Sequence, residues 1–197
     1  MDEFWAIILA AGESTRMGFP KMLLTFNETT MIEKVIANVT ESKVNNILVV
    51  LGACRNELVK QIGNLNVKCC YNENYKEGML SSVQRGFRNL PSDFSSVLVF
   101  QGDQPLITPT SINKVIEAYL TSGKGIIIPV FKGKRGHPIL IGSKYRNEID
   151  KLNPERGLKS LAEEFSYDVL EVDTNDSGIL TDFDTYDEYK NGINQIQ

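Results

Sequence analysis

The sequence predicts an α/β protein, a single domain around a doubly wound, mostly parallel sheet with a Rossmann-like order of elements. Two observations carry this prediction. Short apolar runs alternate along the 197 residues with segments whose apolar residues recur at helical spacing, which is the pattern of βαβ units. The runs are apolar at consecutive positions, as strands buried on both faces require. We therefore expect one domain over residues 1–197.

Several segments are predicted as strands, and a ligand site is expected where they end. The clearest are the apolar runs at residues 4–9, 47–51, 97–100 and 126–130. Residues 67–71 and 169–172 are weaker candidates. In a doubly wound sheet, ligands bind at the carboxyl ends of the strands.

The segments between these strands carry helix signals. Thr30 and Glu33 form a capping-box pattern that opens a helix with one apolar face. Thr108 before Pro109 predicts a second helix start, because proline is favoured at the first helical position. We also expect helices near residues 81–89 and 158–165, and a C-terminal helix after Thr185.

A loop that suits phosphate follows the first strand. Residues 9–21 read LAAGESTRMGFPK. Small residues let the backbone approach a ligand closely, and exposed N–H groups at the end of a strand attract anions. Arg16 and Lys21 add fixed positive charge. The spacing fits neither the P-loop nor the G-x-G-x-x-G motif, so the loop predicts a phosphate-rich ligand held in another way.

A carboxylate follows the strand at residues 97–100. Asp103 lies in Gly-Asp-Gln-Pro, where it could simply satisfy N–H groups of a turn. Beside an anion-binding loop on the same sheet we favour a site for Mg²⁺, or Mn²⁺ in its place, since Mg²⁺ takes one or two carboxylates with phosphate oxygens and water. Asp182 and Asp184 precede the C-terminal helix, so one could reach the metal while the other caps the helix. We expect Asp184 as the second ligand, with Asp182 as the fallback.

Two further segments have both a functional and a structural interpretation. Ser81 and Ser82 follow Gly78 at a predicted helix start, where their hydroxyls could read a base or a phosphate, or cap the helix. Arg135 and His137 lie in Arg-Gly-His-Pro before an apolar run. His137, the chain's one histidine, could form a wall of the site or be a structural loop residue.

Composition argues against several classes of protein. The net charge of −4 argues against a general nucleic-acid binder, which is usually basic. No apolar run approaches the roughly 20 residues needed to span a membrane, and acidic Asp2 and Glu3 stand where a signal peptide is basic. The odd number of cysteines, without metal-ligand spacing, indicates reduced thiols. We expect a cytoplasmic protein that binds neither nucleic acid nor membrane.

Together these motifs resemble the MobA-like nucleotidyltransferases, and within them the molybdenum cofactor cytidylyltransferases most closely. The opening loop of that group reads L-A-A-G-x-S-x-R-M-G-x-x-K, and residues 9–21 match every fixed position. Segments similar to its G-M-S-S-S, R-G-H-P and D-x-D-T-P-E-D motifs follow at residues 78–83, 135–138 and 182–188. The chain departs at Leu80 and Tyr186, where Ser and Pro are common, and at Lys159, which replaces an Arg.

The resemblance implies a nucleotidyltransferase fold that joins CMP from CTP to the phosphate of molybdopterin and releases pyrophosphate. It implies that Asp103 and Asp184 hold the divalent cation and that Arg16 and Lys21 hold the triphosphate, so that Arg16, Lys21 and Asp103 are the catalytic residues. Further nucleotide contacts would come from Leu9, Ala10, Ala11, Gly12, Gly78, Ser81, Ser82 and Gly102. Acceptor contacts would come from Gln104, Arg135, His137 and Lys159.

The sequence is compatible with more than one function. Ala11 stands where similar guanylyl enzymes usually have Gly, and its methyl group suits a pyrimidine, so we expect CTP to be preferred over GTP. A guanylyltransferase, or a cytidylyltransferase for a sugar or polyol phosphate, is the near alternative. A non-catalytic carrier that delivers the finished cofactor to an apo molybdenum hydroxylase belongs to another class. Lys21 together with Asp103 favours catalysis, because a carrier need not bind a metal triphosphate.

Overall fold

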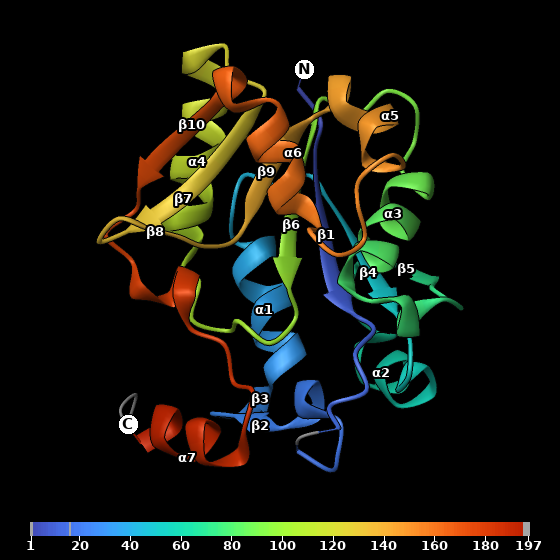
Figure 1. The fold of residues 1–197 in the computed structure, drawn as a ribbon. Coiled ribbons are helices and arrows are strands. Elements are labelled where there is room, and N and C mark those ends of the chain that lie inside the picture. Colours follow the sequence, from blue (N-terminus) through green and yellow to red (C-terminus); the bar gives the residue numbers. More distant parts are fainter. Residues whose placement is uncertain (1, 16, 195–197) are drawn as a thin grey trace.

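A mixed sheet of eight strands forms the centre of the computed structural model, which describes residues 2–15 and 17–194. The strand order is β10-β7-β9-β6-β1-β4-β5, with β8 paired to β7 (Figure 1). A separate hairpin pairs β2 with β3. The bounds are β1 Phe4–Ala10, β2 Thr25–Phe26, β3 Thr29–Thr30, β4 Asn46–Leu51, β5 Lys68–Tyr71, β6 Ser96–Gln101, β7 Ile126–Phe131, β8 Lys134–Arg135, β9 Ile139–Gly142 and β10 Val169–Asp173.

The expected doubly wound, mostly parallel sheet is confirmed. One strand in the middle of the sheet, β9, is antiparallel to its neighbours. β1 lies at the centre, parallel to β4 and β6. β9 enters antiparallel between β6 and β7. The sequence does not predict this strand, because its three consecutive apolar residues are too short a run to separate a strand from a loop.

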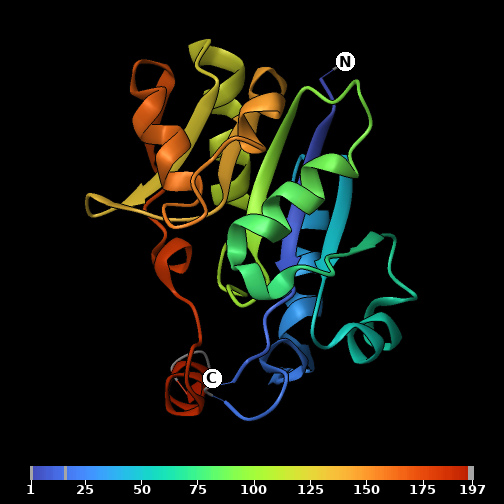
Figure 2. The same ribbon diagram turned by 45° about the vertical axis from the view of Figure 1, so that its right-hand side comes forward.

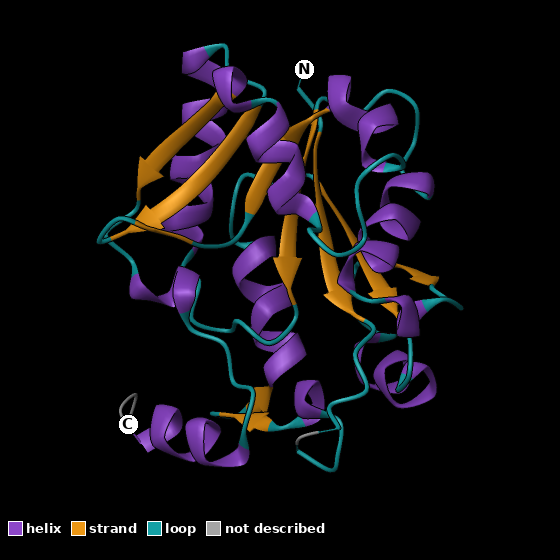
Figure 3. Ribbon diagram, viewed as in Figure 1, coloured by secondary structure: helices purple, strands orange, loops and turns teal. Residues whose placement is uncertain are grey.

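Helices cover both faces of the sheet (Figure 3). Alternate residues of β1 enter two different cores, because successive side chains of a strand point to opposite faces: Ala6 and Ile8 enter one, Trp5 and Ile7 the other. The first core, with Ala6 and Ile8, holds α1 (Met31–Thr40), α2 (Arg55–Ile62) and α4 (Pro109–Ser122). The second core holds α3 (Met79–Arg88), α5 (Arg146–Ile149) and α6 (Leu158–Glu164).

None of the helices in the described part of the chain is long and apolar enough to cross a membrane.

The register of the central strands fixes where a ligand can bind. Leu9 of β1 lies opposite Gln101 of β6, and the N–H of Gly102 donates to the carbonyl of Leu9 at 3.0 Å. The loop after β1 therefore starts beside Gly102 and Asp103. Figure 2 shows the second core's α3 lying across this part of the sheet.

The C-terminal segment leaves the sheet and packs on the β2–β3 hairpin. Phe183 joins Phe26 and Met31 in a small separate core. The hydroxyl of Tyr189 donates to the carbonyl of Thr25 at 2.5 Å. Helix α7 (Tyr186–Asn194) lies beside this hairpin, away from the sheet (Figure 1). Residues 181–185 are thereby held close to the N-terminal loop.

Removing the cap of α1 should destabilise the fold. Thr30 accepts a hydrogen bond from the Glu33 N–H, and the Glu33 carboxylate accepts one from the Thr30 N–H. Loss of such a cap costs about 1 kcal/mol. We expect Thr30→Ala to lower the free energy of unfolding by about that amount in urea denaturation. Thr110→Ala, an exposed position in α4, is the control and should change it by less than about 0.5 kcal/mol; equal effects would contradict the prediction.

Candidate active site

Ser14 shapes the loop that follows β1. Its backbone is left-handed, with φ of 53°, and its carbonyl accepts from the N–H groups of Met17 and Gly18 at 3.0 and 3.2 Å. Its hydroxyl accepts from the N–H of Lys21 at 3.1 Å. The loop is thus closed on itself, and Lys21 begins the single 3₁₀ turn Lys21–Leu23. Arg16, predicted to bind phosphate, lies outside the described residues.

The ammonium group of Lys21 lies between two carboxylates. Its Nζ donates to Asp103 Oδ2 and, at 3.1 Å, to Asp184 Oδ1. The Lys21 and Asp103 side chains are only 15% and 9% exposed, and that of Asp184 is 31% exposed. The structure thus brings together three of the predicted residues, from the N-terminal loop, the end of β6 and the C-terminal segment.

The charges at this point shift two pKa values. Burial lowers the pKa of Lys21, but the carboxylates of Asp103 and Asp184 more than offset that effect, so the pKa is raised and the amine stays charged at neutral pH. Partial desolvation, followed by the charges of Asp103 and Asp184, raises the pKa of Asp182. Asp182 therefore lies in the same negative field, although Asp184 makes the contact with Lys21.

Asp103 and Asp184 are suited to hold a divalent cation. Their oxygens converge on one cationic atom, and carboxylates are the hard oxygen donors that Mg²⁺ and Mn²⁺ prefer. Within residues 2–15 and 17–194, no set of three His, Cys, Asp or Glu residues forms a complete metal site. A cation held here would therefore complete its coordination with water and ligand oxygens, as Mg²⁺ commonly does at phosphate sites.

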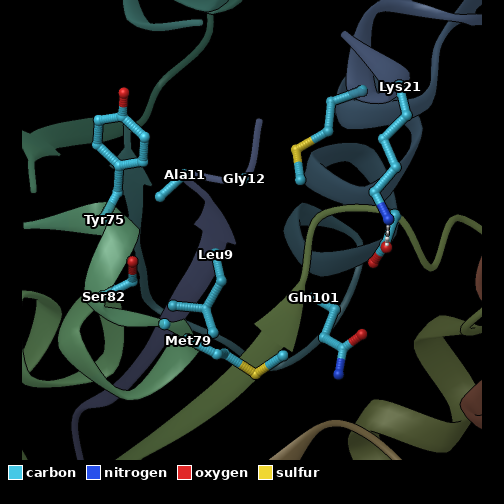
Figure 4. Close-up of a pocket in the computed structure, with 11 residues that line it drawn as sticks. Leu9, Ala11, Gly12, Lys21, Tyr75, Met79, Ser82 and Gln101 are labelled. Carbon is cyan, nitrogen blue, oxygen red and sulfur yellow. Dashed lines mark hydrogen bonds and ion pairs between the residues drawn. The ribbon is translucent and has the colours of Figure 1, made fainter. Parts of the chain in front are cut away.

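A cavity of about 290 Å³ opens above the ends of β1 and β6 (Figure 4). Most of the residues predicted to hold the nucleotide or the metal line it. Its wall also includes residues that were not predicted. The predicted lining residues are Leu9, Ala11, Gly12, Lys21, Gly78, Ser82 and Asp103, and the others are Met22, Tyr75, Met79 and Gln101.

Among the residues that the structure describes, three that were predicted to contact the nucleotide do not line this cavity. Ala10 is buried in the first core. Gly102 packs behind the wall, where a Cβ atom would lie 2.8 Å from the Met22 sulfur. The Ser81 hydroxyl lies 2.9 and 2.8 Å from the carbonyls of Asn74 and Gly78, so it holds the loop before α3. It does not cap the helix, the structural role considered for it, because no side chain caps α3 at Gly78.

Ser82 is oriented by Asn72. The amide of Asn72 donates to the hydroxyls of Ser81 and Ser82 at 2.9 and 3.0 Å. Since the Ser82 oxygen accepts this bond, its own hydrogen is the group that it can offer. Of the two serines, Ser82 is therefore placed as a hydrogen-bond donor at the cavity wall.

A second cavity of about 400 Å³ adjoins the first and shares Met79 with it. Its floor is apolar and its rim is basic. Arg135, His137 and Lys159, three of the four predicted acceptor-binding residues, line it, together with the unpredicted Arg156. The basic side chains are exposed and form ion pairs with Glu171 and Glu163. An apolar molecule that carries a negative charge fits such a cavity.

Gln104, the fourth predicted acceptor-binding residue, is not part of this cavity. Its side chain is 4% exposed and lies between α1 and α4, beside Asn38 and Ile107. The strand β6 has ended by then, and the turn at Asp103 directs the next side chain into the first core. The structure therefore separates Gln104 from the other acceptor candidates.

The cap of α7 differs from the expectation that one aspartate would supply it. Glu188 Oε2 accepts from the N–H groups of Asp184 and Thr185 at 3.0 and 2.8 Å, and the Thr185 hydroxyl accepts from the Glu188 N–H at 3.3 Å. This reciprocal capping box leaves the Asp184 carboxylate for Lys21. The signal was present in the sequence, as Thr185 and Glu188 have the required spacing.

Other residues that shape the site were not predicted. Met79 stands within the motif at residues 78–83, where only Gly78 and the serines were taken as site residues. Gln101 directly precedes the motif at Gly102, so extending that motif by one residue would have included it. Gly52 was missed because its role is close packing: a Cβ atom there would lie 2.3 Å from the Ala11 carbonyl oxygen. Tyr75 carried no signal in the sequence. Arg156 stands three residues before Lys159, in the segment from which only Lys159 was taken as a site residue.

Neutralising Asp103 should weaken cation binding. Asp103→Asn removes the more buried of the two carboxylates, so we expect the Kd for Mn²⁺ in the presence of inorganic tripolyphosphate to rise about tenfold or more, or about 1.4 kcal/mol. Electron paramagnetic resonance of free Mn²⁺ measures this. Asp150→Asn, at an exposed ion pair with Arg88, should leave Kd unchanged; an unchanged Kd for Asp103→Asn would refute the site.

Comparison with known proteins identifies the family. Molybdenum cofactor cytidylyltransferase of Escherichia coli K12 is 29% identical over 191 residues, which cover 96% of this chain and 95% of that protein. Rv0371c of Mycobacterium tuberculosis H37Rv superimposes with a TM-score of 0.88 at 21% identity over 98% of both chains. A second structure of Rv0371c, in complex with manganese, has a TM-score of 0.79 at 20% identity and the same coverage.

The fold also occurs in a cytidylyl enzyme with its nucleotide bound. CMP:2-keto-3-deoxy-manno-octonic acid synthetase complexed with CTP has a TM-score of 0.76 at 14% identity, over 99% of this chain and 98% of that one. At such identities the structural likeness shows the fold alone. Residues 6–169, most of the chain, match the MobA-like NTP transferase domain. The chain therefore belongs to the MobA-like nucleotidyltransferases.

Proposed function

We propose that this nucleotidyltransferase joins CMP from CTP to the terminal phosphate of molybdopterin and releases pyrophosphate. The observation that carries the proposal is the pair of adjoining cavities. One contains the Lys21–Asp103 pair at the end of β1 and β6, and the other is apolar with a basic rim. The similarity to the E. coli molybdenum cofactor cytidylyltransferase, which extends over 96% of the chain, supports this choice of substrates.

The transfer needs positioning more than acid–base chemistry. A phosphate monoester is largely dianionic near pH 7, so its oxygen can attack the α-phosphorus without a general base. The new P–O bond forms as the bond from the α-phosphorus to the bridging oxygen breaks, and pyrophosphate leaves with that electron pair. Asp103 and Asp184 would hold the divalent cation, which would neutralise charge on the phosphate oxygens.

The chain's own residues hold both substrates. Lys21 donates to Asp103 and Asp184 in this structure, and when these carboxylates hold a cation its ammonium group would be released to donate to a phosphate oxygen. Ser82 offers a hydrogen to an acceptor atom of the base. On the acceptor side, Arg135, Arg156 and Lys159 attract the phosphate, while the apolar floor packs against the ring system. Such positioning and electrostatic stabilisation account for most catalysis of phosphoryl transfer.

Product analysis tests the proposal directly. The purified protein is incubated with CTP, Mg²⁺ or Mn²⁺ and molybdopterin, and pyrophosphate release and the CMP-pterin product are measured. We expect both to appear together. Pyrophosphate release only with GTP, or only with a sugar or polyol phosphate, would overturn the substrate assignment, and no release with any nucleotide would favour a carrier.

Lys21 should contribute to turnover as well as to binding. Its contacts with phosphate strengthen as charge moves onto pyrophosphate, so Lys21→Ala should lower kcat and raise the KM for CTP. We expect kcat/KM to fall by about 100-fold or more, as when a preorganised donor is removed. Lys43→Ala, at an exposed pair with Glu117, is the matched control. A change in KM with kcat unchanged would mean that Lys21 binds the substrate and the transition state equally, and would contradict a role in turnover.

Ala11 should contribute to the choice of base. It lines the cavity that contains the Lys21–Asp103 pair, which we call the nucleotide cavity, as we call the second one the acceptor cavity. Ala11 is backed by Gly52, so its methyl group has no room to move away from a bound base. We expect kcat/KM to be higher for CTP than for GTP, and Ala11→Gly to reduce that ratio by about tenfold, the lower end of what one methyl-sized change is worth. Ala53→Gly, exposed beside Gly52, should leave the ratio unchanged. An equal ratio in wild type and Ala11→Gly would contradict this role.

A further inference from the structure

The two cavities meet at a hydrogen bond between Gln101 and His137. Gln101 ends β6 and lines the nucleotide cavity, while His137 precedes β9 and lines the acceptor cavity. Gln101 Nε2 lies 2.9 Å from His137 Nε2. Figure 4 shows Gln101 and Lys21 on one side of the nucleotide cavity, with Ser82 and Tyr75 on the other. The pair therefore links the lining of the two cavities, which also share Met79.

The surroundings of His137 fix its tautomer. Nδ1 lies 3.3 Å from the carbonyl of Val99, which can only accept, so Nδ1 carries the hydrogen. The backbone N–H of His137 donates to the Ile179 carbonyl at 3.0 Å, which holds the residue in place. Burial lowers the pKa of His137, so the ring is neutral near pH 7. Nε2 is therefore a lone-pair acceptor.

This tautomer determines the orientation of the Gln101 amide. A lone pair on Nε2 can only accept, so the amide nitrogen of Gln101 must face His137 and donate one of its two hydrogens. The second hydrogen of the same nitrogen remains for a ligand. Because the amide is neutral, it adds no negative charge beside Asp103 and does not repel an incoming phosphate.

We propose that Gln101 contacts the attacking phosphate with its second amide hydrogen and that His137 is the positioning residue that holds this amide. The inference rests on the proposed function of the two cavities. It also gives the histidine a role other than that of a base, since its Nε2 lone pair is already occupied by Gln101. The pair aligns the acceptor oxygen with the α-phosphorus, where a displacement of about 1 Å can cost a factor of about 100 in rate.

Kinetics of matched variants test the proposal. Gln101→Met keeps the side-chain length and removes the donor, and His137→Leu removes the acceptor that orients it. We expect each to lower kcat 10- to 100-fold, as estimated from the cost of misalignment, with little change in the KM for CTP. The double variant should be no slower than Gln101→Met, because both act through one contact. His137→Asn, which restores an acceptor, should recover part of kcat.

Controls separate positioning from stability. Gln84→Met makes the same substitution in α3, where Gln84 donates to the Ile149 carbonyl at 3.1 Å, and should leave kcat unchanged. All variants are compared by melting temperature. A kcat within threefold of wild type for Gln101→Met, or additive losses in the double variant, would overturn the inference. Wild-type turnover of CTP with molybdopterin tests the proposed function separately.

The chain's one histidine provides a readout that does not need turnover. In untagged protein with ¹⁵N-labelled histidine, we expect nuclear magnetic resonance to show the Nδ1–H tautomer and a shift of the Nε2 signal in Gln101→Met. Addition of CMP and inorganic phosphate should shift the Nε2 signal of the wild type but not of Gln101→Met. An Nε2 signal that responds to neither change would overturn the proposal even if the enzyme is active.

Discussion

The ammonium group of Lys21 holds three distant segments of the chain at one point. Its partners Asp103 and Asp184 are 82 and 163 residues away in the sequence. Without the Lys21 ammonium group, the carboxylates of Asp103 and Asp184 would repel each other and the nearby Asp182, in a part of the protein that water reaches poorly. The position of the C-terminal segment against the N-terminal loop thus depends on charge neutralisation, with the small core around Phe183 as its apolar support. The ion pairs of Lys21 thus both hold the C-terminal segment in position and bring the site residues together.

Much of the fold could be predicted because its signals are local. The apolar runs of β1, β4, β6 and β7 and the caps at Thr30 and Thr108 were visible residue by residue, and the structure confirms them. The antiparallel β9 and the helix α2 were not predicted. The pairing of β9 with β6 and β7 is a long-range contact, and α2 buries only Leu58 and Ile62, too few apolar residues to give a clear helical pattern.

The site was predictable where function is tied to a motif and not where it depends on packing. Lys21, Asp103 and Asp184 meet as their residue types suggested. Gln104 lies in the same motif as Asp103, and Ser81 lies in the same motif as Ser82. The backbone nevertheless directs the Gln104 side chain into the core and the Ser81 hydroxyl onto the loop before α3. Gln101 and Arg156 become relevant only through the antiparallel course of β9 and the position of α6. No single-residue property in the sequence carries that information.

The reversal of β9 has a consequence for how this kind of enzyme can diverge. An antiparallel strand begins at the edge where its parallel neighbours end, so the residues before β9 reach the same edge as the loops after β1 and β6. The cavity proposed for the nucleotide is lined from β1, β6 and α3, and the cavity proposed for the acceptor is lined largely from β7, β9 and α6. Changes in the β7–β9 connection can therefore alter the choice of acceptor while the nucleotide cavity is inherited intact. If the proposed function is correct, acceptor and nucleotide specificity would be separable traits in this architecture.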